Sequence, residues 1–224
     1  MFLLDKVFKK KGEVGPAAHR GSAVEQGIVL GLQEDATEEE CINHADKEFW
    51  RLTALSTDPR REKERASVGE MVKIGLKELK PYGKPTSAQG KVEYAVEGLA
   101  VPLIGYYDLV WENHKILTDI KTTHALPSQI KINHARQVSL YIKATGAGFD
   151  PRLTYITTKK CATYRLENVD EHVRSLERIA LAIQKFLSVS DDPAELAAMV
   201  MPDYESFYFN DADVKQTAFD IWGV

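Results

Sequence analysis

Cysteine is scarce in this chain of 224 residues, which contains only Cys41 and Cys161. Two cysteines cannot build a disulfide framework, and they cannot supply the four thiolates of a structural zinc or iron–sulfur site. Any metal in the protein must therefore be held by oxygen or histidine ligands, which are the donors that hard or borderline divalent cations accept.

Long apolar runs are also missing. No stretch approaches the ~20 apolar residues that are needed to cross a bilayer, and 28% of the residues are charged. The segment Met1–Lys11 has a short apolar start followed by lysines, which reverses the order of a secretory signal. We therefore expect a globular protein without a membrane role, located in the cytoplasm, which would be the host cytoplasm if a phage encodes the chain.

The sequence has no Walker phosphate loop, because Gly83 and Lys84 are followed by Pro85. ATPase function is therefore excluded. The formal net charge of −4 argues against a protein that coats nucleic acid through a global basic surface. The charge is uneven, however, because Ile120–Phe149 contains no Asp or Glu. The basic side chains of this candidate positive strip are Lys121, Lys131, Arg136 and Lys143.

Apolar periodicity predicts helices toward both ends of the chain and strands in the middle. The predicted helices begin after Pro16, after a Thr37/Glu40 capping box and at Asp58, and two more cover 127–145 and 173–186. The predicted strands cover 92–96, 101–111, 115–121, 152–158 and 162–166. This order predicts an α/β fold with a central mixed sheet flanked by helices. We expect one domain over 1–224, with its core at about 16–190 and an aromatic and acidic segment at 202–224.

Two neighbouring predicted strands carry the residues that indicate chemistry. Gly105-Tyr-Tyr-Asp108 lies on one strand, and Asp119-Ile-Lys121 lies on the next. If the strands form a hairpin, Asp108 lies near Asp119, and Lys121 shares a face with Asp119 because strand side chains alternate. Adjacent carboxylates repel each other, and a hard divalent cation such as Mg²⁺ removes that repulsion while it polarises a bound phosphate.

An Asp-x-Lys triplet is a weak signal alone, because a solvated strand face explains most such triplets. Two further features accompany it here. Arg20 and Glu25 lie on the first predicted helix, and Gln137 and Tyr141 lie four residues apart, hence on one face, of the helix after the central strands.

Together these motifs resemble the PD-(D/E)XK nuclease superfamily, and within it the RecB-type branch that includes phage recombination exonucleases and CRISPR adaptation nucleases. The resemblance covers roughly Arg20 to Leu166 and implies a restriction-endonuclease-like core. It implies that the catalytic residues are Glu25, Asp108, Asp119 and Lys121. The implied ligands of one or two Mg²⁺ or Mn²⁺ ions are Glu25, Asp108, Asp119 and the Ile120 carbonyl. The expected substrate contacts are Gln137, Tyr141, Arg20, Arg136 and Lys131.

The chain departs from that family pattern in two respects. Many RecB-type relatives have histidine in the first-helix motif, where this chain offers Glu25, which is still an oxygen ligand. Some relatives add a four-cysteine iron–sulfur cluster, which two cysteines exclude here. The resemblance is therefore to a minimal form of the family.

The function expected from the resemblance is a Mg²⁺- or Mn²⁺-dependent exonuclease that hydrolyses DNA from its ends, in recombination, repair or phage DNA processing. The alternatives are a restriction-like or junction-cleaving endonuclease of the same fold, a non-catalytic nucleic-acid-binding relative, and an unrelated nucleotide phosphohydrolase. DNA is the expected partner. A homo-oligomer and a single-strand-annealing or single-strand-binding partner protein are further expectations, while polarity and strand preference stay open.

Overall fold

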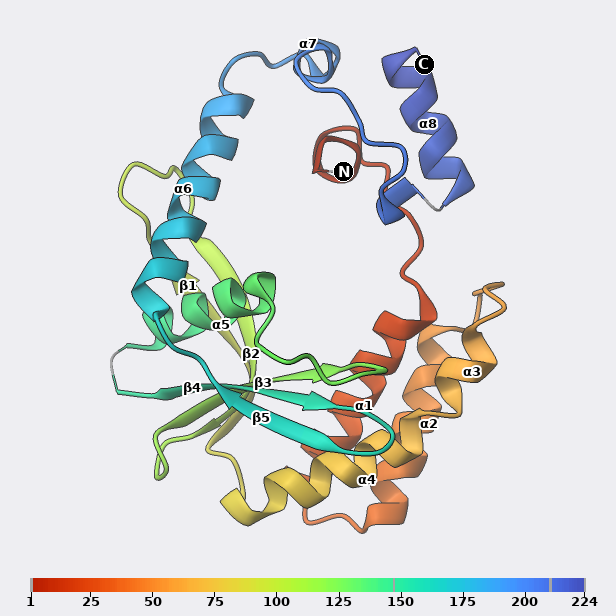
Figure 1. Cartoon of the computed structure of the whole chain (residues 1–224), viewed down its shortest axis with the longest axis vertical. Coiled ribbons are helices and arrows are strands. Elements are labelled where there is room, and N and C mark those ends of the chain that lie inside the picture. The colour runs from red at the N-terminus through yellow and green to blue at the C-terminus, as the bar shows by residue number, and fades with distance from the viewer. Residues whose placement is uncertain (1, 147, 210, 224) are drawn as a thin grey trace. The chain divides into compact units, whose positions relative to one another are not determined.

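The computed structural model describes residues 2–146, 148–209 and 211–223, and their contacts divide the chain into two compact units (Figure 1). The sheet unit is Gly15–Glu177, and the terminal unit consists of the described residues of Met1–Val14 and Arg178–Val224. The sequence predicts one domain. That count stays a prediction, because compactness does not show whether either unit folds alone.

Two helices open the sheet unit where the sequence predicts them. α1 (Pro16–Gln33) has a proline in its first turn, where a missing backbone N–H costs nothing. α2 (Glu38–Leu52) begins at the predicted capping box, in which Thr37 and Glu40 satisfy each other's backbone N–H groups. Both predicted helix starts are confirmed.

The single helix predicted from Asp58 to Leu79 is wrong. The structure has two helices there, α3 (Arg61–Arg65) and α4 (Val68–Leu79), followed by a short 3₁₀ turn, η2 (Lys80–Tyr82). In an unbroken helix Glu64 would lie on the same face as Val68, which belongs to the apolar stripe of α4. The break removes this carboxylate from the stripe and lets it pair with an arginine of α1.

Five strands form one mixed sheet, in the order β1-β2-β3-β4-β5. The strands are β1 (Ser87–Tyr94), β2 (Leu103–Trp111), β3 (Ile116–Thr122), β4 (Asp150–Ile156) and β5 (Cys161–Arg165). β3 and β4 are parallel and the other neighbours are antiparallel. The predicted α/β class with a central mixed sheet is therefore confirmed. β1 begins earlier than predicted because its first residues pair with β2 although they lack apolar alternation.

α5 (Ile132–Thr145) connects the two parallel strands, as a parallel pair requires a crossover. The sequence predicts this helix from Pro127, and the structure starts it later. The Pro127 carbonyl accepts a hydrogen bond from the Tyr164 hydroxyl at 2.7 Å, and Lys131 has extended backbone at the N-cap. A tertiary contact and an extended residue therefore replace the expected first turns.

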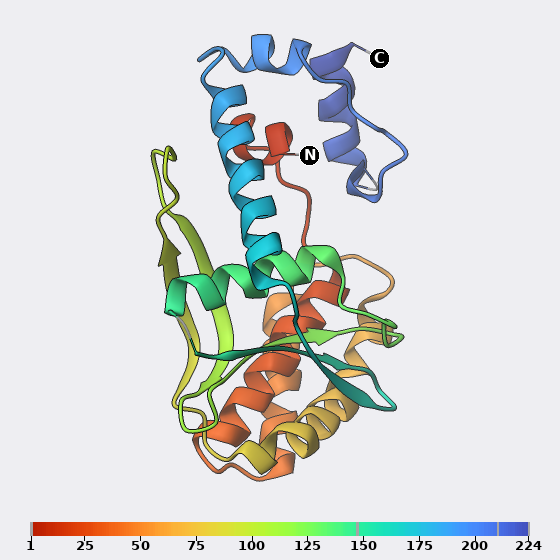
Figure 2. The same ribbon diagram turned by 60° about the vertical axis from the view of Figure 1, so that its left-hand side comes forward.

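The two faces of the sheet carry separate hydrophobic cores, as the alternation along β3 shows. Ile116 and Ile120 pack with the buried residues of α1, α2 and α4. Leu117, between them in sequence, packs with α5. α1 and α5 accordingly lie on opposite sides of the strands (Figure 2). Asp119 and Lys121 have the same parity as Leu117, so they share the face that α5 covers.

β2 and β3 separate within the sheet. Their ladder joins Leu109–Trp111 to Ile116–Thr118. Beyond that ladder, the first half of β2 pairs only with β1, and the second half of β3 pairs only with β4. Figure 2 shows the β1–β2 hairpin running away from the other strands. We call this point, where Asp108 and Asp119 follow the last β2–β3 pair, the fork.

The terminal unit is helical and contains much of the predicted aromatic and acidic segment 202–224. Its elements are η1 (Leu3–Val7), the end of α6 (Val169–Leu187), α7 (Pro193–Ala198), η3 (Phe207–Phe209) and α8 (Ala212–Trp222). Leu4 packs there with Phe209 and with α8. Asn210 and Val224 of the predicted segment lie outside the described residues. No helix in the described part of the chain is long and apolar enough to span a membrane.

The close packing of Tyr141 on Gly105 explains why the Gly-x-x-Asp motif has a glycine at this position. A Cβ at this position would lie 2.5 Å from Cε1 of Tyr141, so the ring of α5 can pack on β2 only if this residue has no side chain. We expect Gly105→Ala to lower the free energy of unfolding by about 1–3 kcal/mol, as overpacking does. Urea unfolding followed by circular dichroism measures this change.

Gly21→Ala is the matched control for that substitution. Its Cβ would lie 3.4 Å from Oγ1 of Thr122, an ordinary contact, and alanine favours a helix over glycine by roughly 0.8–1.0 kcal/mol. This variant should be as stable as the wild type or more so. Equal stability of Gly105→Ala and wild type would contradict the proposed packing.

Candidate active site

Asp108 and Asp119 face each other at the fork. The last pair of the β2–β3 ladder is Leu109 with Thr118, so the next positions along each strand are these two carboxylates. Oδ2 of Asp108 accepts a hydrogen bond from the Ile120 backbone N–H at 2.6 Å. The side chain therefore satisfies a backbone donor at the point where the two strands part. The structure brings the two predicted acids together.

Lys121 joins them as predicted from strand alternation. Its Nζ lies 2.6 Å from Oδ2 of Asp119, in a short ion pair. The Asp119 side chain is 1% exposed, and that of Lys121 is 25% exposed. Oδ1 of Asp119 is buried and has no hydrogen-bond partner within the part of the chain that the structure describes. Lys121 is thus the member of the cluster that reaches solvent.

Glu25 approaches the cluster from α1 and is half-buried. Its Oε1 accepts a hydrogen bond from Nε2 of Gln89 on β1 at 2.8 Å. Gln89 has a φ of 53°, a left-handed conformation that is costly for a residue with a side chain and tends to occur at functional sites. The flanking β1–β2 pairs place Gln89 opposite Asp108. Sequence reasoning missed Gln89, because neither its residue type nor its spacing distinguishes it.

The electrostatics of the cluster are dominated by burial and by repulsion among acids. Burial, and then Asp119 and Glu25, raise the pKa of Asp108 well above its ordinary value. Burial raises the pKa of Asp119 against the opposing effect of Lys121, and burial also raises the pKa of Glu25. Burial alone would lower the pKa of Lys121, but the three carboxylates raise it. Three acids thus share one lysine, and the remaining negative charge needs a proton or a cation.

The donor set suits a hard cation, although it is not a ready-made three-ligand site. Among the described residues, no three His, Cys, Asp or Glu side chains gather closely enough to hold a metal ion. Mg²⁺ is usually bound by one or two carboxylates, together with water and substrate phosphate. Asp108 and the open Oδ1 of Asp119 fit that pattern, whereas Glu25 is engaged by Gln89. The ligand role of the Ile120 carbonyl stays a prediction.

Gln137 and Tyr141 share one face of α5, as their spacing predicts, and Nε2 of Gln137 donates a hydrogen bond to the Tyr141 hydroxyl. Tyr141 is 2% exposed. Burial, and then the charges of Asp119 and Asp108, raise its pKa. Gln137 is half-buried and is the more accessible member of the pair. The predicted contact with a substrate strand therefore rests on Gln137, while Tyr141 supports it from the core.

Arg20 does not occupy the position expected of a substrate contact. Its guanidinium is 3% exposed and pairs with the buried carboxylate of Glu64 on α3. Nε and Nη2 of Arg20 also donate to Oγ1 of Thr122 at 3.4 Å and 3.3 Å. Contact with a phosphate would draw the guanidinium away from Glu64, whose Oε1 also lies 3.2 Å from Nε2 of His124, and breaking a buried ion pair is strongly destabilising. The structure instead gives Arg20 the role of joining α1, α3 and β3.

Two of the remaining predicted substrate contacts lie near the start of α5. Lys131 is exposed at the N-cap, and Arg136 is half-buried two turns or less into the helix. Nε of Arg136 is buried without a hydrogen-bond partner among the described residues. Both positions are compatible with the expected phosphate contacts, which stay predictions.

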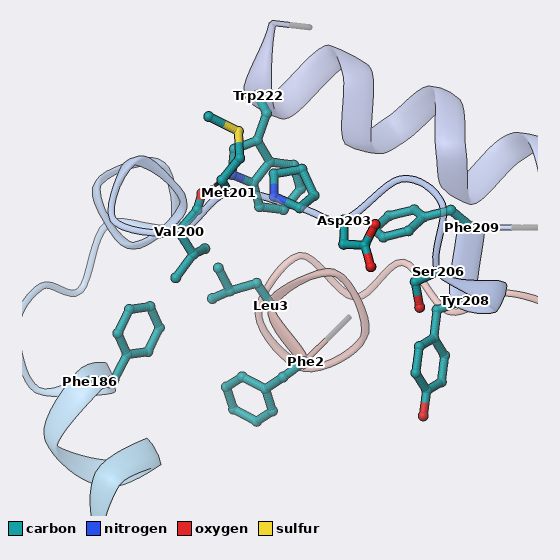
Figure 3. Close-up of a pocket in the computed structure, with 11 residues that line it drawn as sticks. Phe2, Leu3, Phe186, Val200, Met201, Asp203, Ser206, Tyr208, Phe209 and Trp222 are labelled. Atoms are coloured by element: carbon teal, nitrogen blue, oxygen red, sulfur yellow. Dashed lines mark hydrogen bonds between the residues drawn. The ribbon is translucent and has the colours of Figure 1, made fainter.

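A separate cavity of about 360 Å³ lies within the terminal unit (Figure 3). Its lining is mainly apolar, with Phe2, Leu3, Phe186 and Trp222 among the side chains. The predicted catalytic residues belong to the sheet unit, so this cavity is not part of the candidate active site.

Comparison with known proteins adds little to this geometry. No protein-family model matches the chain, and no curated protein matches it. A solved structure described as "Crystal structure of SSO0001" is similar, with 17% sequence identity and a TM-score of 0.39. The likeness covers 82% of this chain and 85% of that one. At this level of similarity it carries no argument about function.

Neutralising Asp108 should stabilise the protein when no divalent cation is present. Because its pKa is raised in the folded state, the wild type loses stability as pH rises from the ordinary aspartate range through that raised value. We expect Asp108→Asn to unfold at a higher temperature at pH 7.5, by about 2–4 °C for each kcal/mol of burial and repulsion cost that the neutral side chain removes. The difference should vanish near pH ~4, where aspartate protonates even in the unfolded chain.

Thermal unfolding of both proteins in chelator over a pH series measures this effect. The side-chain amide oxygen that Asp108→Asn introduces can still accept the Ile120 N–H, so the hydrogen bond is retained. Glu97→Gln, at an exposed acid, is the control and should change little at any pH. A lower unfolding temperature for Asp108→Asn at neutral pH would contradict a stability cost from burying the charged carboxylate beside other acids.

Proposed function

We propose that the protein is a metal-dependent DNA nuclease with a restriction-endonuclease-like core, related to the RecB-type exonucleases of the PD-(D/E)XK superfamily. One observation carries the proposal. Asp108, Asp119 and Lys121 meet at the fork, with excess buried negative charge, an open carboxylate oxygen on Asp119 and a lysine that reaches solvent. Such a set suits a site in which a cation and a phosphate are bound together.

The order of elements supports the same proposal. A helix carrying Glu25 precedes β1, β2 and β3, and α5 then leads into the parallel strand β4. Asp108 on β2 and Asp119-Ile-Lys121 on β3 have the positions that the resemblance assigns to the acidic motifs. Gln137 and Tyr141 follow on α5, beside the same cluster.

In this proposal the acids bind metal ions and Lys121 stabilises charge on the phosphate. Asp108 and Asp119, with Glu25 and the Ile120 carbonyl, would hold one or two Mg²⁺ or Mn²⁺ ions. When bound, such ions lower the pKa of a water and offset charge on the reacting phosphate. Lys121, a quarter exposed and adjacent to Asp119, supplies a positive charge where negative charge grows on the phosphate oxygens.

The substrate side of the site carries basic side chains that can contact phosphate. Lys131 and Arg136 lie on α5, in the stretch of sequence that lacks acids, and Gln137 follows. Contacts to phosphate position a DNA strand without carrying sequence information. We therefore propose DNA as the polymer substrate, with weak sequence preference, and a role in recombination, repair or phage DNA processing.

The first functional prediction concerns the cluster at the fork. Asp119→Ala should abolish Mg²⁺-dependent release of nucleotides, because it removes the carboxylate that has an open buried oxygen. Lys121→Ala should lower kcat by about 10²–10³-fold, the usual effect of losing one electrostatic stabiliser, while the protein still binds Mn²⁺. Quench-flow kinetics and calorimetric titration of Mn²⁺ separate the two effects.

Two exposed residues provide matched controls for these variants. Asp170→Ala removes a carboxylate whose side chain is 77% exposed, and Lys73→Ala removes a lysine of α4 whose side chain is 54% exposed. Both variants should retain activity with Mg²⁺. Undiminished activity of Asp119→Ala, or of the wild type in chelator, would refute the assignment of this site.

The second functional prediction is that cleavage starts at DNA ends. The two proposed phosphate contacts, Lys131 and Arg136, both lie near the start of α5, and so few cations suit a strand terminus better than the middle of a duplex. Linear duplex with labelled ends should release acid-soluble nucleotides, whereas a covalently closed circle should persist under the same conditions.

The alternatives give different results in that experiment. Rapid linearisation of the circle would indicate an endonuclease of the same fold. Binding without cleavage in either metal would indicate a non-catalytic relative, and hydrolysis of mononucleotides but not of polymer would indicate a phosphohydrolase. Each outcome replaces the exonuclease proposal with a specific activity.

A further inference from the structure

A histidine reaches the candidate site through a tyrosine of β4. His134 lies in the first turn of α5, and its Nδ1 is 2.8 Å from the hydroxyl oxygen of Tyr155. Tyr155 pairs with Lys121 in the parallel β3–β4 ladder, so the two side chains share one face of the sheet. The rings of His134 and Tyr155 lie 5.7 Å apart at 35°. His134 is thus fixed beside Lys121 by a specific contact.

The contact with Tyr155 allows one arrangement in which the imidazole proton lies on Nε2. The Lys131 backbone N–H donates to the Tyr155 oxygen at 3.4 Å, which occupies one of the two lone pairs of that oxygen. The single hydroxyl proton of Tyr155 is then free to be donated to Nδ1 of His134. In a neutral imidazole the remaining proton must lie on Nε2. In this arrangement Nε2 is a donor, and it has no hydrogen-bond partner within the described part of the chain.

The surroundings keep this imidazole neutral. Burial, and then the charges of Lys121 and Lys131, lower the pKa of His134 to about 4. The side chain is half-buried, so Nε2 is not sealed into the core. A third cation beside these two lysines would be repelled by them. A neutral N–H can instead contact an anion there without adding to that repulsion.

We propose that His134 is a substrate-binding residue of the candidate nuclease, whose Nε2–H donates a hydrogen bond to a phosphate oxygen of the DNA strand held beside Lys121. Tyr155 is the positioning residue that orients the imidazole and fixes its tautomer. This inference rests on the proposed nuclease function and adds to it a contact that the sequence motifs do not include. It contrasts with a purely structural role, in which His134 would only fasten the first turn of α5 to the sheet.

The test is DNA affinity, measured by fluorescence anisotropy with a labelled duplex in Ca²⁺, while a gel confirms that the DNA stays intact. We expect His134→Ala to weaken binding roughly 10-fold, as the loss of a hydrogen bond to a charged group does. His134→Gln, whose amide N–H can replace Nε2–H, should recover part of that loss. His44→Ala, at a half-buried histidine of α2, is the control and should bind like the wild type.

Salt dependence distinguishes a neutral contact from a cationic one. Lys131→Ala should reduce the slope of log Kd against log salt by about 0.9, because one phosphate contact by a cation is lost. His134→Ala should leave the slope unchanged. Tyr155→Phe should weaken binding less than His134→Ala, and the double variant should lose no more than His134→Ala alone, because the tyrosine acts through the histidine.

The outcomes separate this inference from the function on which it rests. A wild type that neither binds nor cleaves DNA defeats the proposed function and this inference together. A wild type that cleaves DNA, with full affinity in His134→Ala and a lower unfolding temperature, leaves the nuclease intact and overturns the substrate contact. A reduced salt slope in His134→Ala would overturn the neutral donor. If His134→Ala does not fold, the DNA affinity and salt slope of His134→Gln and Tyr155→Phe are compared with those of the wild type instead.

Discussion

The repulsion between buried carboxylates at the fork is the constraint on which the rest of the sheet unit depends. Asp108 and Asp119 face each other where β2 and β3 part, and both are almost fully buried. Little water can reach them there. The Ile120 N–H instead donates a hydrogen bond to Asp108, and Lys121 forms an ion pair with Asp119. These contacts do not balance the charge of all the acids, which include Glu25. A fold selected for stability alone would not retain such a group of acids.

Packing on both sides of the sheet holds the fork in place despite this cost. The ring of Tyr141 packs directly on Gly105, which ties α5 to the part of β2 that has left β3. On the other face, the buried pair of Arg20 and Glu64 joins α1 to α3, and Thr122 connects it to β3. Breaking either contact would leave a buried cavity or a buried charge. The acids are therefore positioned by apolar packing and one ion pair, not by attraction among themselves.

The sequence predicts those parts of the site that depend on local periodicity. Alternation along β3 is sufficient to place Asp119 and Lys121 on one face, and helical spacing is sufficient to pair Gln137 with Tyr141. What it cannot predict are partners brought in from distant segments. Gln89 acquires its role only because the β1–β2 register sets it opposite Asp108. From the sequence Arg20 is expected to contact phosphate, because its partner Glu64 lies 44 residues away and cannot be recognised by spacing.

The ion pair between Lys121 and Asp119 leaves both groups able to bind further charged partners. In the described structure its ammonium is held by Asp119, yet a quarter of the side chain remains exposed. Asp119 keeps a second oxygen with no donor in the described residues, so the ion pair does not saturate the carboxylate. A charged group that is only partly satisfied gains more from a new partner of opposite sign than one that is fully paired. The burial and the repulsion among acids that raise the pKa of Asp108 therefore also favour binding of a cation by the carboxylates, while the exposed part of Lys121 can bind an anion.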